Sequence, residues 1–121
     1  MARILIIDDE PLVRKTTRLV LEANGHSIVE ASDGREGMQA FGLQKFDLVI
    51  TDVLMPNQDG LETLDAIHSV DSSTKVLCIS GGGRSGNREF LKIAEKLGAD
   101  GVLPKPFSME ALIAKVAELC A

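Results

Sequence analysis

The 121-residue sequence lacks several features on which large classes of proteins depend. Its thirteen lysines and arginines are scattered among eighteen aspartates and glutamates, which gives a formal net charge of −5. Binding to nucleic acid requires clustered lysine and arginine side chains that contact phosphates. The acidic balance and the lack of a basic stripe therefore argue against nucleic acid as a direct partner.

Segments typical of export or of membranes are also missing. The N-terminus passes from Met1-Ala2-Arg3 directly into a short strand-like segment, without the apolar stretch of a signal peptide. No apolar stretch approaches the roughly 18 residues of a transmembrane helix. Cys78 and Cys120 have no spacing typical of a metal site or a disulfide framework. We therefore expect a cytoplasmic protein with two reduced thiols and no membrane insertion.

Familiar catalytic motifs are absent as well. The glycines of the segment 81–87 are not followed by the Gly-Lys-Ser/Thr of a P-loop. The segment 8–11 holds Asp-Asp-Glu-Pro where a dinucleotide-binding fold carries its glycines. His26 and His68 are isolated, so neither a Ser–His–Asp nor a Cys–His arrangement can be assembled. The glycines are better interpreted as a hinged loop.

The sequence does contain five strand-like segments that alternate with five helix-like ones. The strands are expected at 3–7, 27–31, 46–51, 75–79 and 101–104, and the helices at 10–24, 32–44, 61–68, 88–97 and 108–119. Continuous apolar strands are typical of a parallel sheet covered on both faces. We therefore predict one domain over residues 1–121, an α/β fold with a doubly wound five-stranded sheet in the order 2-1-3-4-5, flanked by five helices and flavodoxin-like.

Polar residues follow four of these strands. Asp8-Asp9 follows the first strand, Asp52 the third, Ser80 the fourth and Lys105 the fifth. The carboxyl ends of parallel strands share one edge, and the predicted order makes the first and third strands neighbours. Carboxylates about 4 Å apart repel by roughly 4 kcal/mol, which favours a bound cation. Mg²⁺ prefers such oxygen ligands, and Lys105 suits an anionic phosphate.

Each of these residues has a simpler interpretation when it is taken alone. The aspartates can cap a helix or end a strand in a turn, and Lys105 can be an ordinary surface lysine. A serine at a strand end, such as Ser80, is weak evidence of function. Their joint occurrence at one edge is what favours a site.

Taken together, these motifs resemble the receiver domain of response regulators. The resemblance rests on Asp8-Asp9 after a strand, Asp52 followed by Met55-Pro56 and Asp59-Gly60, Ser80, and Gly98-Ala99-Asp100 leading to Lys105-Pro106-Phe107. It covers the whole chain in order and spacing. The resemblance implies a phosphoacceptor signalling protein that promotes its own phosphotransfer, and not a turnover enzyme.

The resemblance also implies residue roles. Asp52 would accept a phosphoryl group from a phosphohistidine on a sensor histidine kinase or a phosphotransfer protein. Asp9 and Asp52 would bind Mg²⁺ directly, Asp8 through water, and Leu54 through its backbone carbonyl. Lys105 would contact the phosphoryl oxygens, with a cis bond before Pro106. Ser80 would respond to the phosphoryl group and so switch binding of a downstream protein.

Three positions depart from the family pattern. Val102 stands where the family usually has Tyr or Phe, so we expect output to pass through the loop 81–87 and the fourth helix. Leu54 and Gly82 replace polar side chains that help to position the hydrolytic water. We therefore predict a phosphoaspartate that hydrolyses slowly.

Two other functions remain open. A small hydrolase with Asp52 as nucleophile needs a substrate pocket and usually a cap domain, for which 121 residues leave no room. A degenerate receiver that acts only as an interaction module would normally lose an acidic residue or the lysine. The chain starts at Met1 and ends just past the last helix. If it is complete, it acts as a diffusible switch or phosphorelay carrier; if it is an excised part, its output lies elsewhere.

Overall fold

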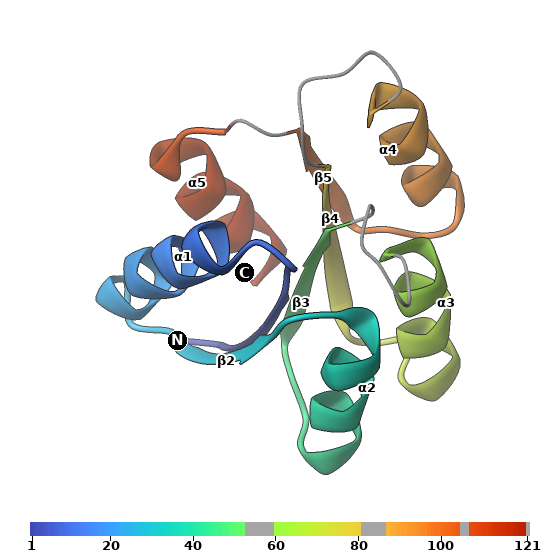
Figure 1. The fold of residues 1–121 in the computed structure, drawn as a ribbon, viewed down its shortest axis with the longest axis horizontal. Helices are drawn as coiled ribbons and strands as arrows, with labels where there is room; N and C mark the ends of the chain where they lie inside the picture. Colours follow the sequence, from blue (N-terminus) through green and yellow to red (C-terminus); the bar gives the residue numbers. More distant parts are fainter. Residues whose placement is uncertain (53–59, 81–86, 105–106, 121) are drawn as a thin grey trace.

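A computed structural model describes residues 1–52, 60–80, 87–104 and 107–120. Five parallel strands form one sheet in the order β2-β1-β3-β4-β5, as predicted from the sequence (Figure 1). The strands are β1 (Arg3–Ile7), β2 (Ser27–Ala31), β3 (Leu48–Asp52), β4 (Lys75–Ser80) and β5 (Gly101–Pro104). The helices are α1 (Pro11–Ala23), α2 (Gly34–Leu43), α3 (Gly60–Val70), α4 (Asn87–Lys96) and α5 (Met109–Leu119). The predicted α/β fold class is therefore confirmed.

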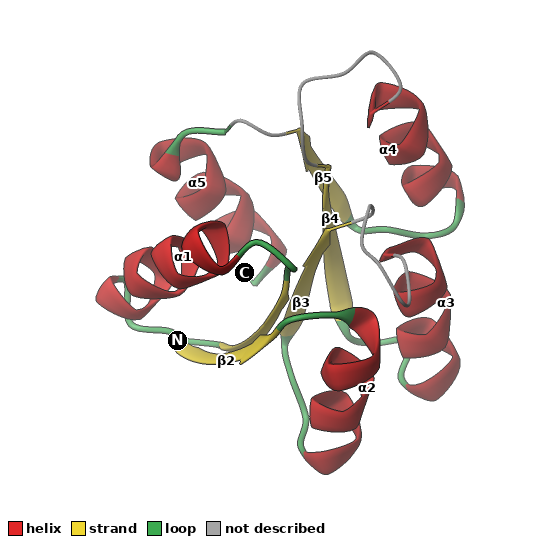
Figure 2. Ribbon diagram, in the orientation of Figure 1, coloured by secondary structure: helices red, strands yellow, loops and turns green. Residues whose placement is uncertain are grey.

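The helices cover both faces of the sheet, which explains why the strands are apolar throughout. Helices α1 and α5 lie on one face, and α2, α3 and α4 lie on the other (Figure 2). In β1, Ile4 and Ile6 pack in the cluster with α1 and α5, whereas Leu5 and Ile7 pack in the cluster with α2, α3 and α4. Each fully buried side chain of this size stabilises the fold by roughly 1.5–3 kcal/mol.

Local capping interactions account for the observed ends of α1 and α2. Asn24 caps α1, and Gly25 has a φ of 91°, a left-handed conformation that glycine adopts without strain. Asp33 caps α2 by accepting a hydrogen bond from the Glu36 N–H, and Glu36 in turn accepts one from the Ser32 hydroxyl. Local sequence thus determines where these helices begin and end.

Gly37, which reads in the sequence as a weakness in the second helix, has a packing role. A Cβ atom at this position would overlap Cδ1 and Cγ1 of Ile7, whereas a Cβ at Gly42 would meet nothing within 4 Å. Gly37 therefore permits the close approach of α2 to the end of β1. Among the described parts of the chain, no helix is both long and apolar enough to cross a membrane.

Candidate functional site

The sheet order brings Asp8 and Asp52 together. In the parallel pairing of β1 with β3, Ile7 lies opposite Thr51, and the residue that follows each of them is an aspartate. Asp8 is fully buried and Asp52 is 1% exposed. Two carboxylates thus lie at adjacent strand ends, as the sequence predicted, and the structure adds that both have almost no access to bulk water.

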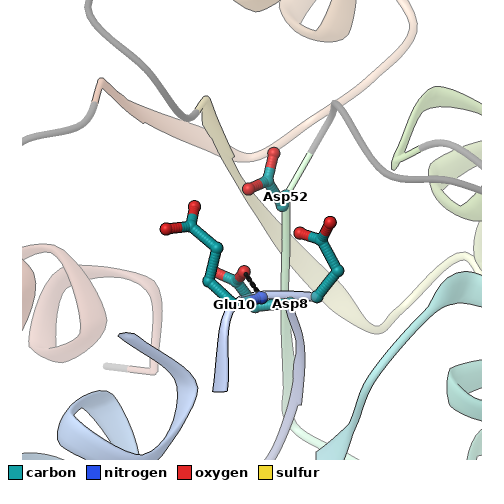
Figure 3. A group of neighbouring side chains, drawn as sticks. Asp8, Glu10 and Asp52 are labelled. Carbon is teal, nitrogen blue, oxygen red and sulfur yellow. Dashed lines mark hydrogen bonds between the residues drawn. The ribbon is translucent and has the colours of Figure 1, made fainter. Parts of the chain in front are cut away.

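The loop between β1 and α1 adds two more carboxylates. Asp9 and Glu10 are exposed, and each of Asp8, Asp9, Glu10 and Asp52 offers a carboxylate oxygen within 4.8 Å of the others. The Glu10 N–H donates a 2.9 Å hydrogen bond to Asp8 Oδ1, which ties the loop back onto the strand end. Figure 3 shows Asp8, Glu10 and Asp52 gathered at the carboxyl edge of the sheet. We call these four residues the acidic cluster.

Neither Asp8 nor Asp9 caps α1, so the simpler interpretation of this pair as helix caps is wrong. The N-cap residue is Glu10, and its side chain makes no capping hydrogen bond. Pro11 begins the helix, where its missing N–H has no cost. The sequence interpretation used Glu10 only as a helix start and missed its place in the acidic cluster. The signal for it was the run of three consecutive acidic residues.

The donor set of the acidic cluster fits a hard divalent cation. Carboxylates about 4 Å apart repel by roughly 4 kcal/mol per pair at an effective dielectric constant of 20. Magnesium prefers oxygen ligands, uses one or two carboxylates, and keeps several waters. The acidic cluster supplies such oxygens from two buried and two exposed carboxylates, and the exposed pair stays in contact with solvent. The residues therefore fit Mg²⁺.

The remaining predicted residues are placed only in part. Ser80 is the last residue of β4, one position beyond Ile79, which lies opposite Asp52 in the β3–β4 pairing. The backbone of Ser80 is therefore at the same edge as Asp52. Leu54, Gly82, Lys105 and Pro106 lie outside the described residues.

A buried cysteine beside this edge does not take part in the site. Cys78 lies opposite Thr51 in the sheet and is fully buried. Burial raises the pKa of its thiol to about 12, with a further contribution from the negative charges of Asp100 and Asp52. At neutral pH the group is therefore a thiol, and it supplies neither a nucleophile nor a metal ligand.

Comparison with known proteins decides the family. Residues 4–117 match the family described as the response regulator receiver domain. This chain belongs to that family. Response regulator MprA of Mycolicibacterium vanbaalenii is 37% identical over 117 residues, which cover 97% of this chain and 49% of that protein. The chain thus spans about half the length of the curated relatives that it matches.

Solved structures show the same receiver fold. The NtrX structure from Brucella abortus superposes with a TM-score of 0.92 at 30% identity, covering 98% of this chain and 27% of that one. The chemotaxis protein CheY4 of Vibrio cholerae gives a TM-score of 0.85 at 28% identity and covers 98% of both chains. The chain is therefore a receiver domain of a response regulator, a signalling protein with a CheY-like fold.

Val102, the position at which the resemblance implied an aromatic residue, lies inside the sheet. This residue lies in β5 opposite Cys78 and is half-buried against the cluster that packs under α2, α3 and α4. A branched aliphatic side chain at this position has no hydroxyl and far less surface than tyrosine. An aromatic side chain that changes rotamer is therefore not available here for transmitting a signal.

Proposed function

We propose that this receiver accepts a phosphoryl group from a phosphohistidine onto Asp52 and that phosphorylation switches its binding to a downstream protein. The observation that carries the proposal is the pair of buried carboxylates, Asp52 and Asp8, at the ends of adjacent strands. Asp9 and Glu10 complete an acidic cluster around them. A signalling receiver needs such a group to hold a cation beside its phosphoacceptor.

Asp52 acts as the nucleophile in this proposal. One of its carboxylate oxygens forms a bond to phosphorus while the phosphorus–nitrogen bond to the histidine breaks, and the imidazole leaves with the electron pair. Asp52 is 1% exposed, and packing of this kind limits the positions that its carboxylate can take. Phosphoryl transfer depends mainly on such positioning and on neutralising the charge of the transferred oxygens.

Positive charge at the site has two proposed sources. When bound, Mg²⁺ neutralises the acidic cluster and the transferred phosphoryl oxygens. Asp9 and Asp52 would hold it directly, Asp8 through water, and the Leu54 carbonyl would be a further ligand. Lys105 would contact the phosphoryl oxygens as a point charge. The receiver thereby promotes its own phosphotransfer.

Phosphorylation changes the charge at the end of β3. It replaces one negative charge by about two and adds three acceptor oxygens. Ser80 at the end of β4 is the proposed group that responds, because its backbone follows the residue opposite Asp52. The change would reach a partner through the segment that joins β4 to α4. With Leu54 and Gly82 in place of polar residues, we expect slow hydrolysis of the phosphoaspartate.

The proposed partners follow from this chemistry. A sensor histidine kinase or a histidine phosphotransfer protein donates the phosphoryl group, and an unidentified protein reads the result. Residues 1–121 would act as one receiver unit in the cytoplasm, where such kinases present their phosphohistidine.

Incubation with acetyl phosphate and Mg²⁺, followed by intact mass measurement, tests the proposal. We expect one phosphoryl adduct in the wild type and none in Asp52→Ala. The matched control is Asp65→Ala, which removes an exposed aspartate of α3 and should leave the adduct in place. An adduct that persists in Asp52→Ala would refute the assigned acceptor, and failure of the wild type with every donor would refute phosphorylation itself.

A further inference from the structure

A guanidinium group connects the acidic cluster to β2, the edge strand that pairs with β1. Arg14, on the first turns of α1, donates a 2.7 Å hydrogen bond from Nη1 to the backbone carbonyl oxygen of Asp8. The same side chain donates a 2.9 Å hydrogen bond from Nε to Glu30 Oε1 on β2. Only 15% of the Arg14 side chain is exposed. The group therefore spans from β2 to the loop that holds the carboxylates.

The bonded carbonyl has a special position in the chain. It belongs to the peptide that joins Asp8 to Asp9, and a peptide unit is planar. Fixing its oxygen therefore fixes the plane between two residues of the acidic cluster. The Asp8 N–H donates to the Ala31 carbonyl at 3.1 Å, so the main chain of Asp8 is held at both of its polar groups.

Glu30 holds Arg14 in place and balances its charge. Its second oxygen, Oε2, accepts a 2.9 Å hydrogen bond from Arg18 Nη1, and Arg18 also pairs with Glu22. Burial raises the pKa of Glu30, but the hydrogen bonds from Arg18 and Arg14 outweigh it and hold the pKa below its usual value. The network of two arginines and two glutamates carries no net charge at neutral pH.

We propose that Arg14 is a positioning residue for the cation site. It holds the Asp8–Asp9 peptide in the orientation that presents the carboxylates, and Glu30 keeps its guanidinium directed at that peptide. This inference rests on the proposed cation site and deepens it, because the resemblance to the family assigned no role to Arg14 or to Glu30. Groups that orient metal ligands typically change metal affinity by 10-fold to 100-fold when they are removed.

Arg18 provides a matched control. Both arginines lie on α1, one turn apart, and both donate to Glu30, but Arg14 alone of the two has a hydrogen bond to the Asp8 carbonyl. Arg14→Met and Arg18→Met remove the same charge from the same helix. A role in positioning predicts different cation affinities for the two variants, whereas a role only in the salt-bridge network predicts similar ones.

The direction of the change in Mg²⁺ affinity distinguishes a positioning role of Arg14 from a purely electrostatic one. Removing a positive charge near a carboxylate cluster strengthens cation binding by itself. We nevertheless expect Arg14→Met to bind Mg²⁺ about 10-fold more weakly than the wild type. Arg18→Met should bind as tightly as the wild type or slightly more so. Arg14→Lys keeps the charge but reaches only one of the two partners, and should recover part of the loss.

The experiment is a titration of the protein with MgCl₂, followed by the amide NMR signals of Asp8, Asp9 and Glu10. Amide hydrogen exchange at Asp9 and Glu10 without metal gives a second measurement, and we expect faster exchange in Arg14→Met only. Thermal unfolding of each variant verifies that it is folded. Equal Mg²⁺ affinities for Arg14→Met and Arg18→Met would overturn the inference. Absence of Mg²⁺ binding in the wild type would instead count against the proposed cation site.

Discussion

Strand β3 has an aspartate at each end, and the two aspartates behave in opposite ways. Asp47 directly precedes the strand at the amino edge of the sheet, and its Oδ2 accepts a 2.8 Å hydrogen bond from the Arg3 N–H. Its own N–H donates to the Arg3 carbonyl at 2.8 Å. Asp52, at the carboxyl edge, is buried and lies within the acidic cluster. At the amino edge the Asp47 carboxylate is bonded to the backbone of a neighbouring strand, whereas at the carboxyl edge four carboxylates lie within 4.8 Å of one another.

The same pair of hydrogen bonds to a neighbouring strand occurs at the amino end of β5. Asp100 accepts a 2.9 Å hydrogen bond from the Val76 N–H through Oδ2, and its N–H donates to the Val76 carbonyl at 2.9 Å. Asp47 and Asp100 each extend a strand ladder by one residue, and they precede different strands, β3 and β5. The comparison shows two arrangements of strand-end aspartates, one bonded to the backbone of a neighbouring strand and one gathered with other carboxylates, and only the second supports a candidate cation site.

The largest expected effect is a gain of stability at the carboxyl edge. Without metal, Asp52→Asn should raise the free energy of unfolding by about 2 kcal/mol or more, because repulsion between close carboxylates is on the order of 4 kcal/mol per pair. Urea denaturation followed by circular dichroism measures this free energy. Circular dichroism replaces intrinsic fluorescence because the chain has no tryptophan or tyrosine.

Added Mg²⁺ should reverse the order of the two proteins. A ligand at 100 times its Kd stabilises the folded state by about 2.7 kcal/mol, and this gain should appear in the wild type but not in Asp52→Asn. A variant that is less stable than the wild type in the absence of metal would contradict the picture of a repulsive cluster.

Glycines near the two edges provide the next comparison. Gly37→Ala should destabilise the protein by about 1–3 kcal/mol, because the new methyl group overlaps the buried Ile7 side chain beside Asp8. Gly42→Ala, near the amino edge, should stabilise it by up to about 1 kcal/mol, since alanine favours a helix and the added methyl group meets nothing there. Thermal unfolding of both variants gives the result. Effects of the same sign would mean that α2 shifts freely on the sheet.

Aspartates of the amino edge should respond in the direction opposite to Asp52. Asp47→Asn and Asp100→Asn each replace a charged hydrogen-bond acceptor by a neutral one and should lower the free energy of unfolding by about 1 kcal/mol. Neither should change Mg²⁺ affinity by more than about twofold, since screening weakens interactions over distances beyond about 10 Å. Urea denaturation and a magnesium titration check the two halves of this prediction. A gain of stability in either variant would remove the contrast between the edges.

The smallest expected effect is a pH dependence at the amino edge. His26 Nδ1 accepts a 3.1 Å hydrogen bond from the Ala2 N–H, which requires that nitrogen to be unprotonated. Burial, and then the N-terminal ammonium, lowers the pKa of His26 below its ordinary value of 6.5. As pH falls, His26 therefore becomes protonated in the unfolded chain at a higher pH than in the folded protein.

This contribution to stability is complete above about pH 6.5 and is lost as pH decreases through the lowered folded-state pKa. His26→Gln should flatten that part of the stability–pH curve, whereas His68→Gln should retain it. Urea denaturation at a series of pH values tests this. An unchanged slope in His26→Gln would show that another group is responsible.

The sequence predicted most of the fold because its signals are local. Apolar runs of four to six residues mark strands with both faces covered, and Asn24-Gly25, Asp33 and Ser108 mark helix ends through their own backbone chemistry. The observed helices agree with the predicted ones to within about two residues, the usual spread at fraying ends. Alternation of strands and helices then leaves few possible topologies.

The acidic cluster was predicted less completely. Asp8, Asp9 and Asp52 follow from the strand order, because adjacent parallel strands end at one edge. Glu10 was missed, since a glutamate before a proline is equally typical of a helix start. Arg14 and Glu30 are 16 residues apart on different elements, and nothing local pairs them.

The sequence by itself determined the strands, the helices and the aspartates that follow β1 and β3, since these follow from short-range patterns. The alternation of strands and helices then made the observed strand order the expected one. Only the tertiary structure decided that Ile7 packs against Gly37, where a larger residue would overlap it. It also decided that Asp47 and Asp100 bond to the backbone of neighbouring strands. The hydrogen bond from Arg14 to the Asp8 carbonyl is a third contact of this kind. These contacts depend on how closely helices pack on the sheet and on which side chains meet across it. Packing distances arise from the whole core at once, so no short segment of sequence specifies them.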